Sequence, residues 1–222
     1  MNKAWFVTGT DTGIGKTFVT CALLRGSAAR GLRAVGMKPV AAGADVIDGG
    51  YLNEDTARLM AASNVPADLP LVTQYCLSAP IAPHLAAHDE GVDIDFASIA
   101  AAFGTLESQA DHVFVEGAGG LLVPLGTEGD YADLAKALGL PVILVVGMRL
   151  GCINHALLTV EVLRSRGLHL AGWVANRIDP HMQRCEDNLV SLRERIDAPL
   201  LAVVGHGEHN AAIDIAQVLS ER

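Results

Sequence analysis

The sequence predicts an α/β fold, with a mostly parallel sheet flanked by helices on both faces. Short apolar runs alternate with helical patterns along the chain, which is the order that parallel strands and crossover helices produce. The run Val142–Val146 is continuously apolar, as is typical of a strand buried on both faces. Because the 222 residues contain no repeat, low-complexity tract or linker, we expect a single domain over residues 1–222.

The N-terminal half of the chain is predicted to form three strands and three helices. Gly31 is a plausible C-cap of the first helix, and Asp95 is placed to cap the third. The proline-containing segment Ser63–Asp93 is interpreted as surface loops. In order, we expect the strand Ala4–Val7, the helix Lys16–Arg30, the strand Arg33–Lys38, the helices Asn53–Ala62 and Phe96–Gln109, and the strand His112–Val115 ending at Glu116.

The C-terminal half continues the alternation of strand and helix. Gly167 ends the helix that follows the buried run, as a C-capping glycine does. In order, we expect the helix Asp130–Leu138, the strand Val142–Val146, the helix Ile153–Arg166, the strand His169–Ala175, the helix Gln183–Arg195, the strand Leu200–Val204 and a final helix Ala211–Leu219.

Composition excludes several classes of protein. Half of the residues are hydrophobic, so the chain can bury a core and is not intrinsically disordered. A net charge of −9, from 16 basic and 25 acidic residues, disfavours binding to nucleic acid or to an anionic membrane. The four cysteines are scattered, the N-terminus lacks a signal-peptide pattern, and the longest apolar run, Pro141–Met148, is too short to span a bilayer. We therefore expect a soluble cytoplasmic protein with reduced thiols.

The strongest local signal is the segment Gly9-Thr-Asp-Thr-Gly-Ile-Gly-Lys-Thr17, which follows a strand and opens a helix. Glycines let backbone amides approach phosphate oxygens, and the helix N-terminus adds partial positive charge. Lys16 can then reach the β- and γ-phosphates, and the Thr17 hydroxyl can ligate Mg²⁺. The usual first glycine of such a P-loop falls at Thr10, with Gly9 one residue further out, so the loop is an extended version. A dinucleotide-binding pattern is not matched, and a ligand-free glycine turn is the remaining alternative.

Two acidic residues and a second lysine are candidates for the same site. Glu116 ends an apolar strand and precedes Gly117-Ala-Gly-Gly120, where a backbone turn can approach a ligand. Lys38 ends the second strand, and ligands of open parallel sheets lie beyond the carboxyl ends of strands. From the residues alone, Lys38 could equally be a solvated strand-end lysine. By spacing alone, Asp55 is better explained as a residue that favours the dipole of its helix.

Several further segments carry a resemblance to one family of P-loop enzymes. They are Met37-Lys-Pro-Val-Ala41, Pro80-Ile-Ala-Pro-His84, Glu116-Gly-Ala-Gly-Gly120, Pro141-Val-Ile-Leu-Val-Val-Gly147, Leu150-Gly-Cys-Ile-Asn-His-Ala-Leu157 and Ala171-Gly-Trp-Val-Ala-Asn176. Together with the P-loop, these segments make the chain resemble the dethiobiotin synthetases, ATP-dependent ring-closing enzymes of biotin synthesis, up to about Leu201. The resemblance implies a single P-loop domain that works as a homodimer.

The resemblance also implies roles for individual residues. Lys16 and Lys38 are implied to be catalytic, and Thr17, Asp55 and Glu116 to bind Mg²⁺. The residues implied to bind ATP are Gly13, Ile14, Gly15, Lys16, Thr17, Phe18, Asp55, Glu116, Gly117, Ala118, Gly119, Asn176, Arg177, Gly205, His206, Gly207 and Glu208. Those implied to bind the substrate are Thr12, Lys38, Ala42, Gly119 and Asn154, of which Asn154 would reach across the dimer interface.

The implied reaction starts from 7,8-diaminononanoate and CO₂. CO₂ adds to one amine to give a carbamate, which attacks the γ-phosphate of ATP and forms a carbamic–phosphoric anhydride. The second amine then closes the ureido ring, so the products are dethiobiotin, ADP and phosphate. The chain departs from the family at Ala42, where a serine is common, at Asn188, where some relatives carry an aromatic residue, and over Ala202–His206. We expect the substitution Ala42→Ser to tighten diamine binding.

A P-loop switch ATPase of the partitioning type is the main alternative function. Such proteins usually carry an additional lysine early in the P-loop, and this chain has none between Gly9 and Gly15. The segment Ala211–Arg222 is not a basic amphipathic membrane helix. A cobyrinate-type amidoligase needs a glutaminase domain, and 222 residues cannot hold such a domain beside the P-loop domain. The P-loop alone is also compatible with a small-molecule kinase.

Overall fold

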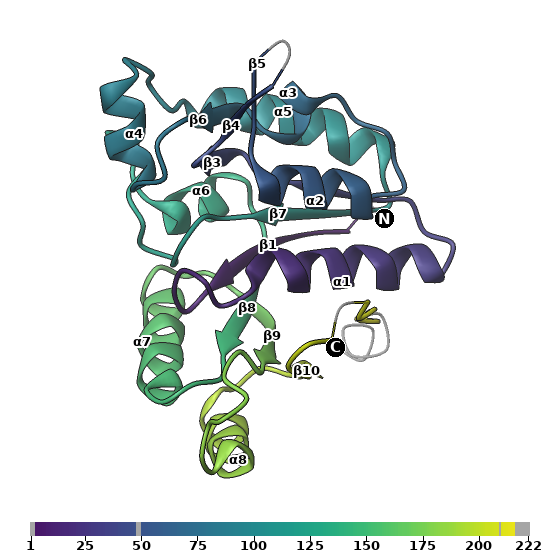
Figure 1. The fold of residues 1–222 in the computed structure, drawn as a ribbon, viewed down its shortest axis with the longest axis vertical. Helices are drawn as coiled ribbons and strands as arrows, with labels where there is room; N and C mark the ends of the chain where they lie inside the picture. Colours follow the sequence, from purple (N-terminus) through teal and green to yellow (C-terminus); the bar gives the residue numbers. More distant parts are fainter. Residues whose placement is uncertain (1–2, 48–49, 209, 216–222) are drawn as a thin grey trace.

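The computed structural model describes residues 3–47, 50–208 and 210–215. Within these residues, six parallel strands form the central sheet, in the order β10-β9-β8-β1-β7-β2 (Figure 1). The strand order reverses at β1, so the carboxyl ends of β1 and its neighbours border a crevice suited to a ligand. The strands are β1 (Lys3–Gly9), β2 (Ala34–Met37), β7 (His112–Glu116), β8 (Val142–Gly147), β9 (Leu170–Asn176) and β10 (Leu200–Val204).

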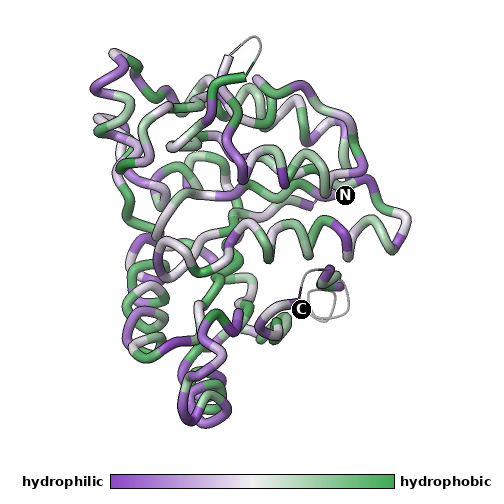
Figure 2. Tube along the Cα trace, viewed as in Figure 1, coloured by the Kyte–Doolittle hydropathy of each residue, from purple (hydrophilic) through white to green (hydrophobic). Residues whose placement is uncertain are grey.

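Helices cover both faces of the sheet, which confirms the predicted fold class. Trp5 and Val7 of β1 lie in the same buried cluster as residues of α1 and α2, whereas Phe6 lies in a cluster with residues of α5 and α6. This alternation follows from the two-residue period of a strand. Figure 2 shows hydrophilic and hydrophobic residues alternating along the outer helices α7 and α8. The helices are α1 (Lys16–Ala29), α2 (Glu54–Ala62), α5 (Phe96–Gln109), α6 (Tyr131–Ala137), α7 (Cys152–Ser165) and α8 (Cys185–Arg195).

The sequence-based predictions for these twelve elements are confirmed, with ends that shift by at most two residues. The caps explain several of the boundaries, because Asn53, Asp95 and Asp130 each accept hydrogen bonds from backbone amides at the start of a helix. The predicted extent of the domain, residues 1–222, is untested and stays a prediction. No helix in the described part of the chain is long and apolar enough to cross a bilayer.

The prediction that Ser63–Asp93 consists of surface loops is wrong. The segment contains α3 (Leu69–Val72), β6 (Tyr75–Leu77) and α4 (Pro83–Asp89), and β6 pairs in parallel with β3 (Val40–Ala42). Prolines lie in the first turns of α3 and α4, where the missing amide costs no hydrogen bond, so they start helices instead of breaking them. Between β3 and α2, the strands β4 (Asp45–Ile47) and β5 (Gly50–Leu52) form a short antiparallel pair.

The predicted final helix Ala211–Leu219 is wrong over residues 211–215, and its remainder lies outside the described residues. The amide of Ile213 donates to the carbonyl of Ala22 in α1 at 2.9 Å, so the segment hydrogen-bonds to α1 instead of to itself. The close approach is possible because residue 26 is glycine. A Cβ there would lie 2.0 Å from the carbonyl oxygen of Ile213.

Candidate active site

The P-loop connects β1 to α1 and is shaped by two glycines in the left-handed region. Gly13 has a φ of 72° and Gly15 a φ of 81°, conformations that residues with a Cβ rarely adopt. Lys16 and Thr17 begin α1, where free backbone amides and the helix dipole favour an anion. The ammonium group of Lys16 donates to the carbonyl of Asp11 at 3.1 Å, within the loop itself. The loop therefore has the geometry of a phosphate cradle.

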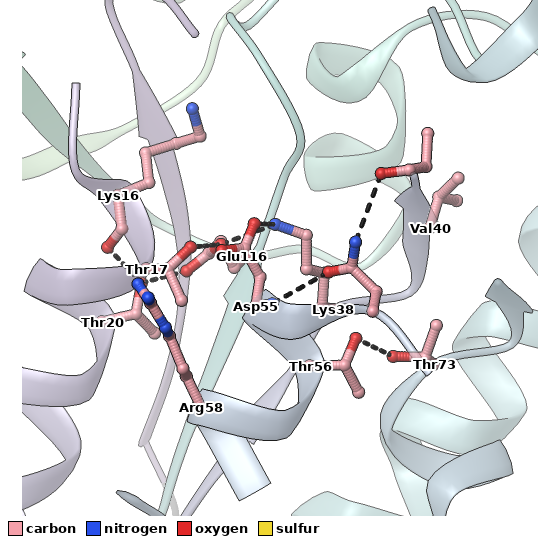
Figure 3. Close-up of polar contacts among 12 residues, drawn as sticks. Lys16, Thr17, Thr20, Lys38, Val40, Asp55, Thr56, Arg58, Thr73 and Glu116 are labelled. Atoms are coloured by element: carbon pink, nitrogen blue, oxygen red, sulfur yellow. Dashed lines mark hydrogen bonds and ion pairs between the residues drawn. The ribbon is translucent and has the colours of Figure 1, made fainter. Parts of the chain in front are cut away.

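A buried cluster of charges lies beside the P-loop (Figure 3). The Lys38 ammonium donates to Asp55 Oδ2 at 2.6 Å and to Glu116 Oε1 at 2.9 Å. Glu116 also accepts from the hydroxyls of Thr17 at 2.7 Å and Thr20 at 2.6 Å. The side chains of Lys38 and Glu116 are 4% and 0% exposed, so this ion pair is screened little by solvent. Three elements of the fold, α1, α2 and the end of β7, thus meet in this cluster.

Local structure explains why Asp55 reaches this cluster. The side chain of Asn53 caps α2 by accepting from the amide of Asp55 at 3.0 Å. The same side chain donates to the carbonyls of Ala42 at 3.2 Å and Gly43 at 2.8 Å, which ties the start of α2 to the end of β3. The first turn of α2 is thereby held against the buried charge cluster, with Asp55 directed to Lys38.

Burial and charge act in opposite directions on the two lysines. Burial would lower the pKa of Lys38, but the charges of Glu116 and Asp55 outweigh it and raise the pKa above its ordinary value. Burial lowers the pKa of Lys16 to about 8, an effect that Glu116 opposes and the charge of Lys38 reinforces. For Asp55, burial would raise the pKa, but the charge and hydrogen bond of Lys38 hold it below its usual value. At neutral pH, Lys38 and Asp55 are therefore ionised.

A cavity of about 710 Å³ opens over the P-loop and this cluster. It brings together eleven of the sequence-predicted site residues, from the P-loop, the start of α1, the end of β2, β3, α2 and the turn after β7. These are Thr12, Gly13, Gly15, Lys16, Thr17, Phe18, Lys38, Ala42, Asp55, Ala118 and Gly119. The sequence-based analysis did not assign the other lining residues, which are Arg58, Pro80, Ile81, Ala82, Pro83 and Val123. Arg58 follows Asp55 by one helical turn, and that spacing could have identified it.

The remaining predicted residues do not line this cavity. Ile14 is fully buried in the core. The Asn176 side chain donates to the carbonyl of Ile14 at 2.8 Å and thus supports the P-loop from β9. Gly117 faces the rings of Phe6 and Tyr131.

Other predicted positions lie further along the same edge of the sheet or outside it. Arg177 pairs with Glu186, and residues 205–208 follow β10, next to the end of β9. Asn154 is exposed on the first turn of α7. The structure therefore separates the predicted residues that line the cavity from those at the ends of β9 and β10.

The donor set of the cluster fits Mg²⁺. Thr17 supplies a hydroxyl and Asp55 and Glu116 supply carboxylates, which are the hard oxygen donors that Mg²⁺ prefers. No group of three or more His, Cys, Asp or Glu side chains within the described residues could cage a metal by itself. Mg²⁺ in nucleotide sites typically takes one or two carboxylates and completes its shell with phosphate oxygens and water. The ammonium of Lys38 lies between the two carboxylates.

Comparison with known proteins gives one family match and close relatives. The family model described as an AAA domain matches residues 3–210. The ATP-dependent dethiobiotin synthetase BioD of Aromatoleum aromaticum is 62% identical over 216 residues, covering 97% of this chain and 95% of the relative. The protein of the same name from Nitrosospira multiformis is 51% identical over 219 residues, covering 99% of this chain and 95% of the relative.

Solved structures resemble the chain in fold alone. The septum site-determining protein MinD of Pyrococcus horikoshii, complexed with Mg-ADP, aligns with a TM-score of 0.56 at 17% identity, covering 91% of this chain and 81% of MinD. A ParA family ATPase of Chlorobium tepidum aligns with a TM-score of 0.57 at 10% identity, covering 100% of this chain and 95% of the ATPase. These similarities agree with the α/β fold of the chain. They do not favour the partitioning-type alternative, because identities this low carry no functional information.

Proposed function

This chain belongs to the ATP-dependent dethiobiotin synthetase family, and we propose that it closes the ureido ring of dethiobiotin from 7,8-diaminononanoate, CO₂ and ATP. The observation that carries the proposal is the shared cavity of Lys16 and Lys38, with the P-loop on one side and Asp55 and Glu116 beneath it. Such a cavity can hold a triphosphate tail beside a second anionic reactant. ATP and Mg²⁺ are the cofactors of this reaction.

The first step joins CO₂ to the diamine. One amine nitrogen attacks the carbon of CO₂ and loses a proton, which leaves an anionic carbamate. In this proposal Thr12 and Gly119 hold the diamine, and Ala42 lies against it where a serine is common in the family. The contribution of the protein here is positioning, because holding the reacting atoms together replaces an unfavourable encounter in solution.

The second step transfers the γ-phosphoryl group. A carbamate oxygen forms a bond to the γ-phosphorus, the bond to the β,γ-bridging oxygen breaks, and ADP leaves. Both reactants are anionic, so their repulsion must be offset by fixed positive charge. In this proposal Lys16 and Lys38 provide that charge on two sides of the phosphoryl group. Thr17, Asp55 and Glu116 would hold Mg²⁺, which would supply further compensation of phosphate charge.

The third step closes the ring. The second amine attacks the carbonyl carbon of the carbamic–phosphoric anhydride, loses a proton, and inorganic phosphate departs with the electrons of the broken C–O bond. Lys16 and Lys38 stabilise the phosphate as it leaves, for the same electrostatic reason. We also assign Asn176, Arg177 and Gly205–Glu208 to nucleotide contacts on the side of the base, because they lie at or just beyond the carboxyl ends of β9 and β10.

We also propose that the protein acts as a homodimer, with the substrate site at the interface. Leu150 is 93% exposed immediately before α7, and Leu158 on the same helix is also exposed. Apolar side chains at this exposure are typical of an interface when they gather on one element. Asn154 lies between them in sequence and would reach the substrate carboxylate of the partner subunit.

The dimer proposal is tested by analytical ultracentrifugation of wild type and Leu150→Asp. We expect a dimer that the substitution converts to monomer with a raised KM for the diamine. A monomeric wild type would contradict the assignment of Asn154.

All four cysteines are free thiols, and we place the protein in the cytoplasm on that basis.

The decisive experiment incubates the protein with ATP, Mg²⁺, bicarbonate and 7,8-diaminononanoate and searches for dethiobiotin by mass spectrometry. We expect one ADP for each dethiobiotin formed, and no product when either bicarbonate or ATP is omitted. A parallel binding assay on DNA and on anionic vesicles at low salt addresses the alternative function. Absence of product together with ATP-dependent retention would replace the synthetase by a partitioning-type switch ATPase.

A further inference from the structure

Arg58 is a cation of the catalytic cavity that has no role in the proposed reaction. It lies on α2, three residues after Asp55 and therefore on nearly the same face of the helix. Its side chain lines the cavity with Lys16 and Lys38. Figure 3 shows it extending from α2 toward the first turns of α1, on the side of Thr17 and Thr20. A guanidinium group thus stands at the metal side of the P-loop.

The present partner of Arg58 holds it weakly. Its guanidinium pairs with Glu54, one turn earlier on the same helix, and the two side chains are 58% and 73% exposed. Exposed pairs of this kind contribute little, because water solvates both charges and two long side chains must be ordered. Lys38 differs, since it is buried between two carboxylates. Arg58 can therefore leave the carboxylate of Glu54 for an anion that carries more negative charge, at a small cost in free energy.

Charge balance gives this exchange a direction. Among the described residues, the site holds three cations, Lys16, Lys38 and Arg58, and two carboxylates, Asp55 and Glu116. Without Arg58 these side chains would carry no net charge, and Mg²⁺ alone would offset the negative charge of the nucleotide and the carbamate. With Arg58 the site has a surplus of one positive charge. A groove of about 450 Å³ between α1 and α2, which Arg58 also lines, leaves the side chain room to move.

We propose that Arg58 is a third phosphate-binding cation of this site, which leaves Glu54 and contacts a phosphate of the nucleotide when ATP binds. This inference rests on the proposed function, because the anion is the polyphosphate of the ATP that the reaction consumes. The planar guanidinium presents two parallel N–H donors that match two phosphate oxygens. Its place one turn after Asp55 couples the contact to the first turn of α2, which also holds the metal-side carboxylate.

The test is a set of binding measurements on Arg58→Gln, Glu54→Gln and the double variant, by titration calorimetry with ATP and Mg²⁺. We expect Arg58→Gln to weaken ATP binding about 10- to 100-fold, the range for loss of a charged hydrogen bond. Glu54→Gln should bind ATP at least as tightly as wild type, because it frees Arg58. The double variant should match Arg58→Gln. The control is Arg164→Gln on α7, which breaks a similar exposed pair with Glu161 away from the cavity and should change nothing.

Several outcomes would overturn the inference. Arg58→Gln binding ATP within twofold of wild type would refute it, as would an equal loss of affinity in Arg164→Gln. Melting temperatures of the variants should match wild type, because Arg58 and Glu54 are both exposed, and a large drop for Arg58→Gln would assign it a structural role instead. If wild type forms dethiobiotin and Arg58→Gln binds ATP normally, only this inference fails. If wild type binds ATP through Arg58 and forms no dethiobiotin, only the proposed function fails.

Discussion

Replacing Lys38 by methionine separates its two roles, as a catalytic cation and as the partner of two carboxylates. The ammonium is 2.6 Å from Asp55 and 2.9 Å from Glu116, and its side chain is 4% exposed. Removing one member of a buried ion pair costs about 3–5 kcal/mol, because the other charge is left without compensation. Here Asp55 is 38% exposed and Glu116 keeps the hydroxyl hydrogen bonds of Thr17 and Thr20, so the loss is smaller. We expect Lys38→Met to lower the free energy of unfolding by about 2–3 kcal/mol.

Urea unfolding and thermal melting at pH 7 measure this change, and dethiobiotin formation measures activity. The melting temperature should fall by about 5–10 °C, since about 2–4 °C accompanies each kcal/mol in a protein of this size. The double variant Lys38→Met/Glu116→Gln should recover much of the stability and no activity. A Lys38→Met variant as stable as wild type would refute the buried-pair reasoning. Near-wild-type turnover would remove Lys38 from catalysis.

Three further predictions concern other residues. Burial lowers the pKa of Lys16 from 10.5 to about 8, so the unfolded chain binds more protons between these pH values and stability rises with pH there. Lys16→Met should therefore unfold in urea at pH 7 with a free energy of unfolding higher than that of wild type by on the order of 2 kcal/mol. This gain in stability should vanish above pH 10. Equal stability of the two proteins at every pH would contradict the reasoning. Ala42→Ser should lower the KM for the diamine about three- to tenfold, the effect of one added hydrogen bond, and an unchanged or higher KM would show that residue 42 does not face the substrate. Gly26→Ala should lower the unfolding free energy by about 1–3 kcal/mol, because the new Cβ would lie 2.0 Å from the Ile213 carbonyl. Gly104→Ala in α5, which meets no atom within 4 Å, should raise it by up to about 1 kcal/mol; loss of stability in both variants would contradict the steric argument.

Elements with strong local patterns were predictable, and elements that depend on distant contacts were not. Val142–Gly147 is a strand because its apolar run suits burial on both faces, whatever its neighbours are. Tyr75–Leu77 is a strand only because Val40–Ala42 lies beside it, and three residues carry too little pattern to predict that pairing. Residues 211–215 have a helical pattern in the sequence, but the amide of Ile213 donates its hydrogen bond to the carbonyl of Ala22 in α1.

The candidate site shows the same division. The P-loop was recognised because its glycines, its lysine and its threonine are consecutive and their spacing itself specifies the chemistry. Thr20 and Arg58 were missed, because a threonine or an arginine in a helix is usually a surface residue. The helical spacing of Arg58 from Asp55 is a weak sequence signal, and no such signal marks Thr20. The packing of α1 against α2 and β7 shows that both residues lie at the site.

By itself, the sequence determined the order of the main strands and helices, the phosphate loop and the resemblance to one enzyme family, all of which depend on residues close together in the chain. Only the tertiary structure decided the state of Lys38. Its partners Asp55 and Glu116 are 17 and 78 positions away, on different elements. Whether a strand-end lysine is solvated or buried between two carboxylates depends on which elements pack over it, and folding alone brings those elements together.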